Sequence, residues 1–225
     1  MIVAIGQQKG GVGKSTLTIA LGVEAHVRGL RTLLVDADEQ ATVRTWAALA
    51  AEDGQATPAV EAAGARELGG LLARSEDLDL VVIDLPPRSD AIARAALMAA
   101  DLLLMPSSGD PADVWSIAAT LRLLEAAREL RPGLRAAMVL ARTRPGTVIA
   151  RQAREVLELD GVPVLRASLS LRVTYPESQA AGLGPTTYAP QSEAADETRR
   201  LLTEVLKLGG SPHGNPKARR SSPRR

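Results

Sequence analysis

The sequence predicts an α/β fold: a mostly parallel β-sheet flanked by helices on both faces. Two observations lead to it. Short apolar runs alternate with longer stretches of helical period, and the runs are continuous, which is typical of strands buried on both faces. The chain has 225 residues, 45% of them hydrophobic, so it is long enough to bury one sizeable core. We therefore expect a single domain over residues 1–208.

The expected strands and helices alternate along the chain. The apolar runs predicted as strands cover residues 2–5, 32–35, 80–83, 102–105, 136–140 and 162–165. The predicted helices cover residues 14–28, 42–51, 66–75, 90–99, 111–130 and 147–159, and Gly29 and Gly161 act as stop signals after two of them. A last amphipathic helix is expected over residues 192–208. We interpret it as a helix that closes the core, and the alternative is a helix lying on a membrane surface.

The composition excludes several kinds of site. The chain has no cysteine, which excludes disulfides, iron–sulfur clusters, zinc–thiolate sites and thiol nucleophiles. With no phenylalanine, two tryptophans and two tyrosines, it does not fit a module that stacks nucleic-acid bases on aromatic rings. The start MIVAIG lacks the features of a signal peptide, and no run of about 18 apolar residues occurs, so we expect a cytoplasmic protein.

The charge is distributed unevenly. The net charge is +1, but five of the 27 basic residues lie in residues 209–225, a stretch without any acid and rich in Gly, Ser, Pro and Arg. That leaves 22 basic residues against 26 acidic ones in the body of the chain. We predict that residues 209–225 form a basic, disordered tail, which either contacts DNA or only keeps the protein in solution.

The strongest motif lies between the first predicted strand and the first predicted helix, the context that a phosphate-binding loop requires. In such a loop, glycines let backbone N–H groups approach phosphate oxygens, the lysine before the serine reaches the β- and γ-phosphates, and the serine hydroxyl binds Mg²⁺. The predicted nucleotide-binding residues are Lys9, Gly10, Gly11, Val12, Gly13, Lys14, Ser15 and Thr16. Gln8 stands where the usual motif has its first glycine, and Lys9 adds a second lysine.

Carboxylates follow two more predicted strands. Asp84 ends an apolar strand and precedes Pro86 and Pro87, as in a Walker B motif that holds Mg²⁺ through water. Asp36 and Asp38 follow another strand, and the carboxyl ends of parallel strands share one edge of the sheet, where such folds bind ligands. We therefore expect Ser15, Asp38 and Asp84 around the metal. The alternative for Asp38 is a simple N-cap of the helix that begins near Thr42.

Together these motifs resemble the ParA/MinD family of deviant Walker A ATPases, whose signature KGGxGK[ST] is present from Lys9. The resemblance implies a P-loop NTPase fold with ATP and Mg²⁺ as cofactors. It also implies that Lys9 reaches the nucleotide of a partner subunit, and that Lys9, Lys14 and Asp38 are catalytic, with Asp38 orienting the attacking water. No guanine-recognition sequence N-K-x-D occurs at residues 141–144, which favours ATP over GTP.

Within the family, the chain is similar to short plasmid or chromosome partition ATPases. This implies an ATP-dependent homodimer on nonspecific DNA, located at the nucleoid, and a small centromere-binding ParB-type partner that stimulates slow hydrolysis. Nonspecific DNA binding requires basic side chains that neutralise phosphates. The candidates are Arg142, Arg144, Arg172, Arg199 and Arg200.

Three other functions share some of these motifs. One is a positioning ATPase for a protein cargo, such as a chemoreceptor cluster or a microcompartment. A second is a MinD-like ATPase on a membrane, against which the lack of bulky aromatic residues near the C-terminal end argues. The third is an enzyme that transfers phosphate to a small molecule, but no segment is long enough for a substrate-binding insertion.

Overall fold

The computed structural model describes residues 1–144, 152, 154–155, 157–158 and 161–210, except for the side chains of residues 111–115. Over these residues the centre of the molecule is a seven-stranded sheet in the order β3-β2-β4-β1-β5-β6-β7, with every neighbouring pair parallel. The strands are β1 (Ile2–Ile5), β2 (Thr32–Asp36), β3 (Ala59–Ala62), β4 (Leu80–Asp84), β5 (Leu102–Ser107), β6 (Arg135–Thr143) and β7 (Leu169–Ser170). The predicted α/β class is confirmed.

Helices connect successive strands, as the sequence predicts. They are α1 (Lys14–Val27), α2 (Thr42–Glu52), α3 (Leu68–Ala73), α4 (Asp90–Ala99), α5 (Pro111–Leu130), α7 (Thr174–Ala180), α8 (Pro185–Tyr188) and α9 (Glu193–Gly209). Of the helix predicted at residues 147–159, the described positions are helical. The rest of that prediction, and most of the predicted tail, lie outside the described residues.

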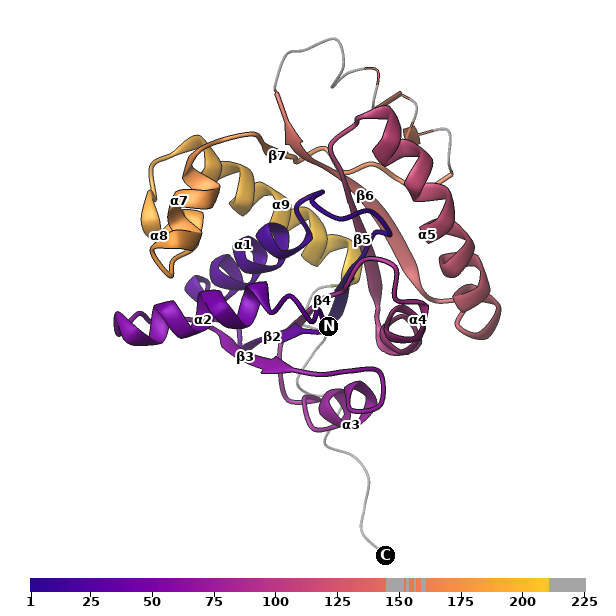
Figure 1. Ribbon diagram of the computed structural model, residues 1–225, viewed down its shortest axis with the longest axis horizontal. Coiled ribbons are helices and arrows are strands. Elements are labelled where there is room, and N and C mark those ends of the chain that lie inside the picture. The colour runs from indigo at the N-terminus through magenta and orange to yellow at the C-terminus, as the bar shows by residue number, and fades with distance from the viewer. Residues whose placement is uncertain (145–151, 153, 156, 159–160, 211–225) are drawn as a thin grey trace, which may run out of the picture.

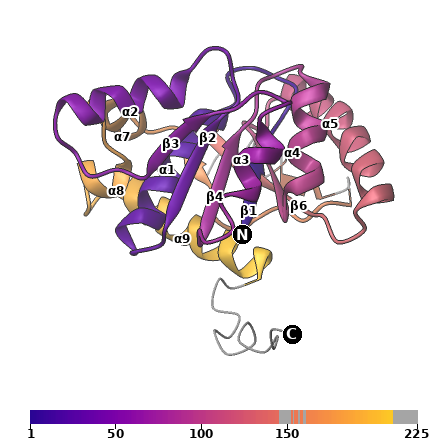
Figure 2. The ribbon, with the colours of Figure 1, turned by 90° about the horizontal axis from the view of Figure 1, so that it is seen from below.

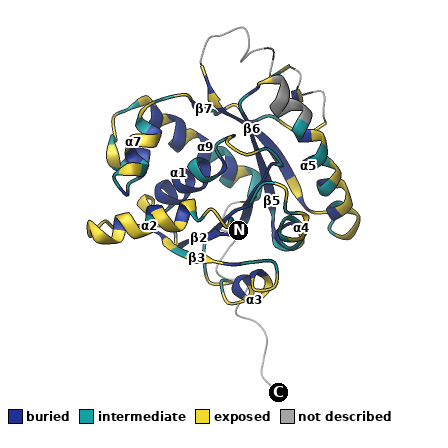
Figure 3. Ribbon diagram, viewed as in Figure 1, coloured by how far each residue is buried: buried dark blue, intermediate teal, exposed yellow. Residues whose placement is uncertain are grey.

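The sheet separates two cores. Helices α1, α2, α7, α8 and α9 cover one face, and α3, α4 and α5 cover the other (Figures 1 and 2). Successive residues of a strand supply opposite cores: in β4, Val81 and Ile83 belong to one cluster, and Leu80 and Val82 to the other. Both faces of the strand are therefore buried, which explains the continuous apolar runs (Figure 3).

Helix α9 packs against the sheet and α1. Its apolar residues Leu201, Leu202 and Val205 are at most 1% exposed and belong to one of the two cores. This stripe is used inside the protein, which supports the interpretation of α9 as a core-closing helix. The helix ends beside the start of the chain, because Gly209 lies directly against the Met1 side chain.

Four elements are absent from the prediction because each is too short or too polar to show a period. Strand β3 is a largely exposed edge strand of four residues, and β7 has only two. Helices α7 and α8 have seven and four residues, respectively, and follow β7.

The strand predicted at residues 162–165 is wrong. Only Val164 makes a bridge there, to Met138 of β6, and the chain pairs with β6 again at β7. The segment is apolar for another reason: Val162 is buried in one core and Leu165 in the other. Burial at the edge of the sheet, rather than strand pairing, accounts for these residues.

Candidate active site

The phosphate loop connects β1 to α1. Gly11 and Gly13 adopt φ angles of 77° and 95°, a left-handed conformation that side-chain-bearing residues rarely take, and they bend the loop around the start of the helix. Gly13 is the N-cap of α1, and no side chain caps the helix there. The first N–H groups of α1 therefore have no side-chain acceptor and face the position that an anion takes at a helix N-terminus.

Lys14 lies inside this loop. It is 6% exposed, and its Nζ donates to the Lys9 carbonyl oxygen at 3.3 Å. Burial lowers the pKa of Lys14, while the negative charges of Asp84 and Asp38 oppose that change. The structure thus places the predicted phosphate-binding lysine within the field of both predicted metal-site carboxylates.

Asp84 ends β4, between β1 and β2, and is 1% exposed. Burial raises its pKa to about 7, and the Ser15 hydroxyl opposes that rise. Even so, neither carboxylate oxygen has a hydrogen-bond partner of normal geometry. A buried carboxylate without such partners is costly by itself and fits a site that is completed by a cation.

The residues present fit Mg²⁺ bound together with a nucleotide. Within the described part of the chain, no group of three or more His, Cys, Asp or Glu side chains could hold a metal. Ser15 and Asp84 supply oxygen donors at the same place, and Mg²⁺ takes few protein ligands when phosphates and water supply the others. The protein side of the site therefore requires phosphate oxygens to complete it.

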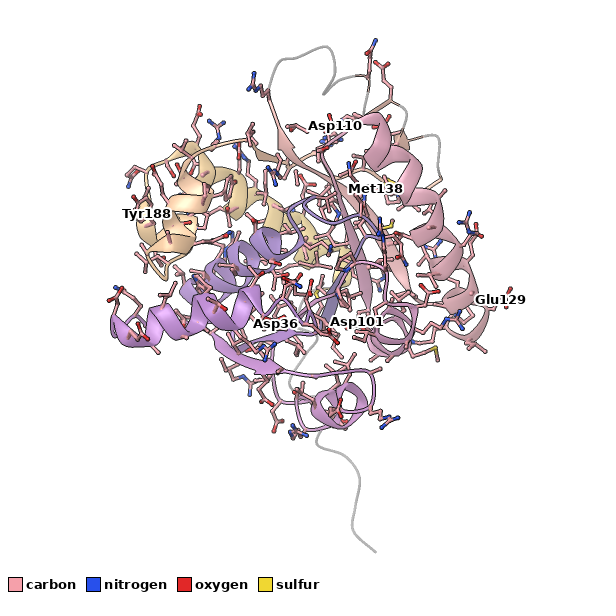
Figure 4. The ribbon with its side chains drawn as sticks, in the orientation of Figure 1. Asp36, Asp101, Asp110, Glu129, Met138 and Tyr188 are labelled. Carbon is pink, nitrogen blue, oxygen red and sulfur yellow. The ribbon has the colours of Figure 1, made fainter. Side chains whose placement is uncertain are left out.

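Asp36 organises the loop that follows β2. Its side chain is labelled in Figure 4. One of its oxygens accepts the backbone N–H of Asp38 at 3.1 Å, and the other accepts that of Arg44 at 2.9 Å. Arg44 is the third residue of α2, so Asp36 satisfies an N–H group in the helix's first turn. Ala41 is the N-cap of α2, with a φ of 56° and no side-chain cap.

Asp38 does not cap α2, so the N-cap alternative is wrong. Its side chain accepts instead from the backbone N–H of Gln40 at 3.0 Å, within the same loop. The Asp38 carboxylate is half-buried, and its negative charge raises the pKa of both Lys14 and Asp84. It therefore remains at the edge of the phosphate site, where solvent reaches it.

A cavity of about 190 Å³ opens beside the phosphate loop. Gly13 and Thr16 line one side of it, and residues of β6, β7 and α7 line the other. Sequence reasoning did not identify this cavity, because its walls come from short elements without a recognisable pattern.

A buried carboxylate holds the far wall of the cavity. Glu197 accepts from the backbone N–H and hydroxyl of Ser170, from the hydroxyl of Tyr175 at 2.9 Å, and from two guanidinium nitrogens of Arg172. Burial acts against its charge, but these hydrogen bonds outweigh burial and lower the pKa of Glu197. Arg172, a predicted DNA contact, also pairs with Glu193.

The predicted DNA-binding arginines fall into separate places. Arg142 lies over the phosphate loop, and Arg144 is exposed two residues further along the chain. Arg199 and Arg200 line an open groove of about 640 Å³ on the α9 side of the sheet. Three more basic residues line the same groove: Arg28, Arg166 and Lys207.

Comparisons with known proteins identify the family of the chain. The family model of the CobQ/CobB/MinD/ParA nucleotide binding domain matches residues 3–186. Over 206 residues the chain is 32% identical to the maintenance of carboxysome distribution protein A of Halothiobacillus neapolitanus, with 90% of this chain and 95% of that protein covered. Over 235 residues it is 31% identical to the chromosome-partitioning ATPase Soj of Thermus thermophilus, with 91% and 94% covered.

A solved structure has the same fold. The septum site-determining protein MinD of Pyrococcus horikoshii, complexed with Mg-ADP, superposes with a TM-score of 0.72 at 22% identity, with 95% of this chain and 99% of that chain covered. The seven parallel strands, the phosphate loop and the family match agree with one another. The chain belongs to the CobQ/CobB/MinD/ParA family of nucleotide-binding domains.

Proposed function

We propose that this ParA/MinD-type ATPase, whose cofactors are ATP and Mg²⁺, is a switch that distributes DNA in the cell. In this proposal it binds ATP, dimerises, binds nonspecific DNA, and is released when a centromere-binding partner of ParB type stimulates hydrolysis. The observation that carries the proposal is the juxtaposition of three charged side chains: buried Lys14, buried Asp84, whose carboxylate has no hydrogen-bond partner of normal geometry, and half-exposed Asp38.

In this proposal the backbone of the phosphate loop and the side chains of Lys14 and Ser15 have separate tasks. Backbone N–H groups at the start of α1 bind phosphate oxygens, and the Lys14 ammonium stabilises charge on the β- and γ-phosphates. Mg²⁺, when bound, offsets negative charge on the phosphates. Ser15 and Asp84 would hold it, and its charge would favour the ionised form of the Asp84 carboxyl.

Asp38 is the residue we assign to the attacking water. Of the carboxylates of Asp36, Asp38 and Asp84, only that of Asp38 is half-exposed. Both Asp36 oxygens accept backbone N–H groups, and Asp84 is buried. The Asp36 contacts and the Asp38–Gln40 hydrogen bond fix the loop that carries Asp38. A carboxylate in this position can orient a water molecule towards the γ-phosphate.

Lys9 extends the site towards a second subunit. Its backbone N–H donates to the Gln7 side chain at 3.0 Å, which fixes the main chain while the side chain is half-buried at the rim of the loop. We assign its ammonium to the nucleotide of the partner subunit, where it would stabilise charge that develops during phosphoryl transfer.

The basic groove is the DNA surface we favour. Arg28, Arg166, Arg199, Arg200 and Lys207 bring five cations to one groove, which the carboxylates of Glu197 and Glu204 also line, so cations are in excess. Phosphate neutralisation alone supports nonspecific binding. The Arg28 guanidinium is already fixed by Glu24, by the Thr203 hydroxyl and by the Arg199 carbonyl oxygen. Arg199 and Arg200 keep their predicted role in this proposal. Arg199 pairs with one exposed carboxylate, that of Asp196, whereas Arg172 pairs with two, those of Glu193 and Glu197.

One relative favours a second function. The similarity to a carboxysome distribution protein supports a positioning ATPase whose cargo is a protein assembly, with the same ATP cycle on DNA. Over the described residues, no helix combines the length and apolar character needed to cross a bilayer. The apolar stripe of α9 is also occupied in the core, so a membrane surface is the weaker alternative.

Fluorescence anisotropy on random duplex DNA with ATP, with ADP or without nucleotide, beside sizing of the same samples, tests the proposal. Dimers and salt-sensitive DNA binding that both require ATP support it. ATP-dependent dimers without DNA affinity contradict the DNA role and leave the ATPase switch. A protein that is encoded by a neighbouring gene and stimulates hydrolysis then separates partition from cargo positioning. Binding of that protein to a specific DNA repeat indicates partition, and binding to a protein assembly indicates positioning.

A further inference from the structure

Arg142 occupies a strained position next to the phosphate loop. Its φ is 59°, a left-handed conformation that is uncommon for a residue with a side chain. The pairing of β6 with β7 shifts register at this point, between Ala141 and Thr143. Such strain persists only where the surroundings determine the conformation, and it is concentrated at functional sites.

The strained backbone aims the side chain at the loop. The Arg142 Nη1 donates to the Gly11 carbonyl oxygen at 2.8 Å. The aliphatic part of the same side chain passes over Gly13, since a Cβ built there would lie 3.7 Å from the Arg142 Cδ. One side chain therefore contacts both of the glycines that bend the loop.

These glycines are also the positions at which the loop is freest to change shape. Glycine populates positive and negative φ about equally, so a loop bent at Gly11 and Gly13 loses entropy when it takes up a single conformation. The guanidinium binds a carbonyl oxygen, so it does not compete with phosphate for an N–H group of the loop. A contact of this kind lowers the cost of binding by fixing the loop beforehand.

We propose that Arg142 is a positioning residue, which holds the phosphate loop in its phosphate-binding shape through Gly11 and Gly13, rather than a DNA contact. This inference rests on nucleotide binding at the phosphate loop and is independent of whether the protein binds DNA.

The test compares nucleotides that differ in their use of the loop. ADP places a β-phosphate in the loop, whereas AMP has none, so competition against a fluorescent ADP is measured for both. We expect Arg142→Ala to weaken ADP binding by about tenfold, the effect of one charge-assisted hydrogen bond, and AMP binding by less than about twofold. Arg142→Lys keeps a donor and should recover part of the loss. Arg122→Ala, an exposed arginine of α5 on the opposite face, is the matched control.

Arg142→Asn separates the effect of losing the Gly11 contact from the effect of backbone strain, because asparagine tolerates the left-handed conformation but cannot reach Gly11. It should behave like the alanine variant, and it also serves if the alanine variant folds poorly by circular dichroism. Unchanged ADP affinity in both variants overturns the inference. Equal losses for ADP and AMP also overturn it and assign Arg142 to the nucleoside. A wild-type protein that binds neither nucleotide contradicts the proposed function itself.

Discussion

Asp36 and Asp84 lie side by side, paired in register at the ends of the parallel strands β2 and β4, yet their carboxylates differ in hydrogen bonding. Asp36 accepts two backbone N–H groups, whereas Asp84 has no hydrogen-bond partner of normal geometry. One carboxylate is satisfied by the protein and builds a loop. Its neighbour is left for a ligand, and this difference makes the site's pH behaviour testable.

Removing the Asp84 charge should stabilise the nucleotide-free protein above neutral pH. Burial raises its pKa to about 7, above the unfolded value, so the stability linked to this group is present at low pH and is lost as pH rises towards and through 7. Between pH 4 and 8 the wild type should lose on the order of 2 to 4 kcal/mol more than Asp84→Asn. Thermal melts without Mg²⁺ or nucleotide, over this pH range, measure the loss of stability in both proteins. Parallel pH profiles would show that Asp84 does not cause the pH-dependent loss of stability.

Asp38→Ala should separate ATP binding from hydrolysis. The half-exposed Asp38 carboxylate contributes to neither the Lys9–Lys14 contact nor the helix cap, so ATP affinity should change by less than about threefold while hydrolysis falls at least about 100-fold. Phosphate release and ATP titration measure the two effects. Glu39→Ala, at the exposed neighbouring position, is the control. Normal hydrolysis by the Asp38 variant would show that another group orients the water.

Lys9→Ala should affect the dimer more than the monomer's affinity. The Lys9 carbonyl and N–H, which contact Lys14 and Gln7, remain in the alanine variant. ADP affinity should therefore stay within about threefold, while hydrolysis falls by about 10³, the effect of a lost charge at the transferring phosphate. Lys14→Gln is the contrasting variant, which should lose nucleotide binding itself. An unaltered ATP-induced dimer and rate in Lys9→Ala would remove the trans-acting role.

Two substitutions in the groove should reduce the salt dependence of DNA binding. Arg199→Ala combined with Arg200→Ala removes two of the groove's cations, so the slope of log affinity against log salt should fall by about two. Anisotropy over a range of salt concentrations at saturating ATP measures the slope. Arg122→Ala, on the other face of the sheet, should leave it unchanged. The same slope in all three proteins would place the DNA surface elsewhere.

Glu197→Gln should destabilise the fold strongly, because it leaves the Arg172 guanidinium without its buried partner. Breaking a buried ion pair costs about 3 to 5 kcal/mol. Glu193→Gln removes the other partner of Arg172, but Glu193 has a side chain 75% exposed and should cost less than about 1 kcal/mol. Urea unfolding compares the two variants, and similar losses would show that burial does not distinguish these carboxylates.

Whether a helix or strand could be predicted from the sequence depends on its length and on how far its residues are buried. Helices α4 and α5 begin and end at the predicted residues, because long helices have a clear period and their caps have sequence signals. Strands β3 and β7 could not be found, since four largely exposed residues and two buried ones have no period. The apolar run at 162–165 was misassigned because apolar composition reports burial and not hydrogen bonding.

The same distinction applies to the site. The phosphate loop is contiguous in sequence, so its residue types and spacing identify it without any tertiary information. The wall made by Ser170, Tyr175 and Glu197 is assembled from residues up to 27 positions apart, and no local pattern marks it. Asp36 and Asp38 look alike in sequence, but only the structure shows that Asp36 is buried and holds the start of α2, whereas Asp38 is half-exposed.

The contact between Met1 and Gly209 has a practical consequence for experiments on this protein. It lies where β1 begins, while the phosphate loop starts where β1 ends, and a four-residue strand spans about 13 Å. A fluorophore or affinity tag added before Met1, or one replacing the chain beyond Gly210, would be attached at the sheet edge opposite the nucleotide. The sizing and melting measurements can therefore use proteins labelled at either position without placing the label at the catalytic edge. The DNA anisotropy measurements should use the label before Met1, because it keeps the five basic residues beyond Gly210 in place.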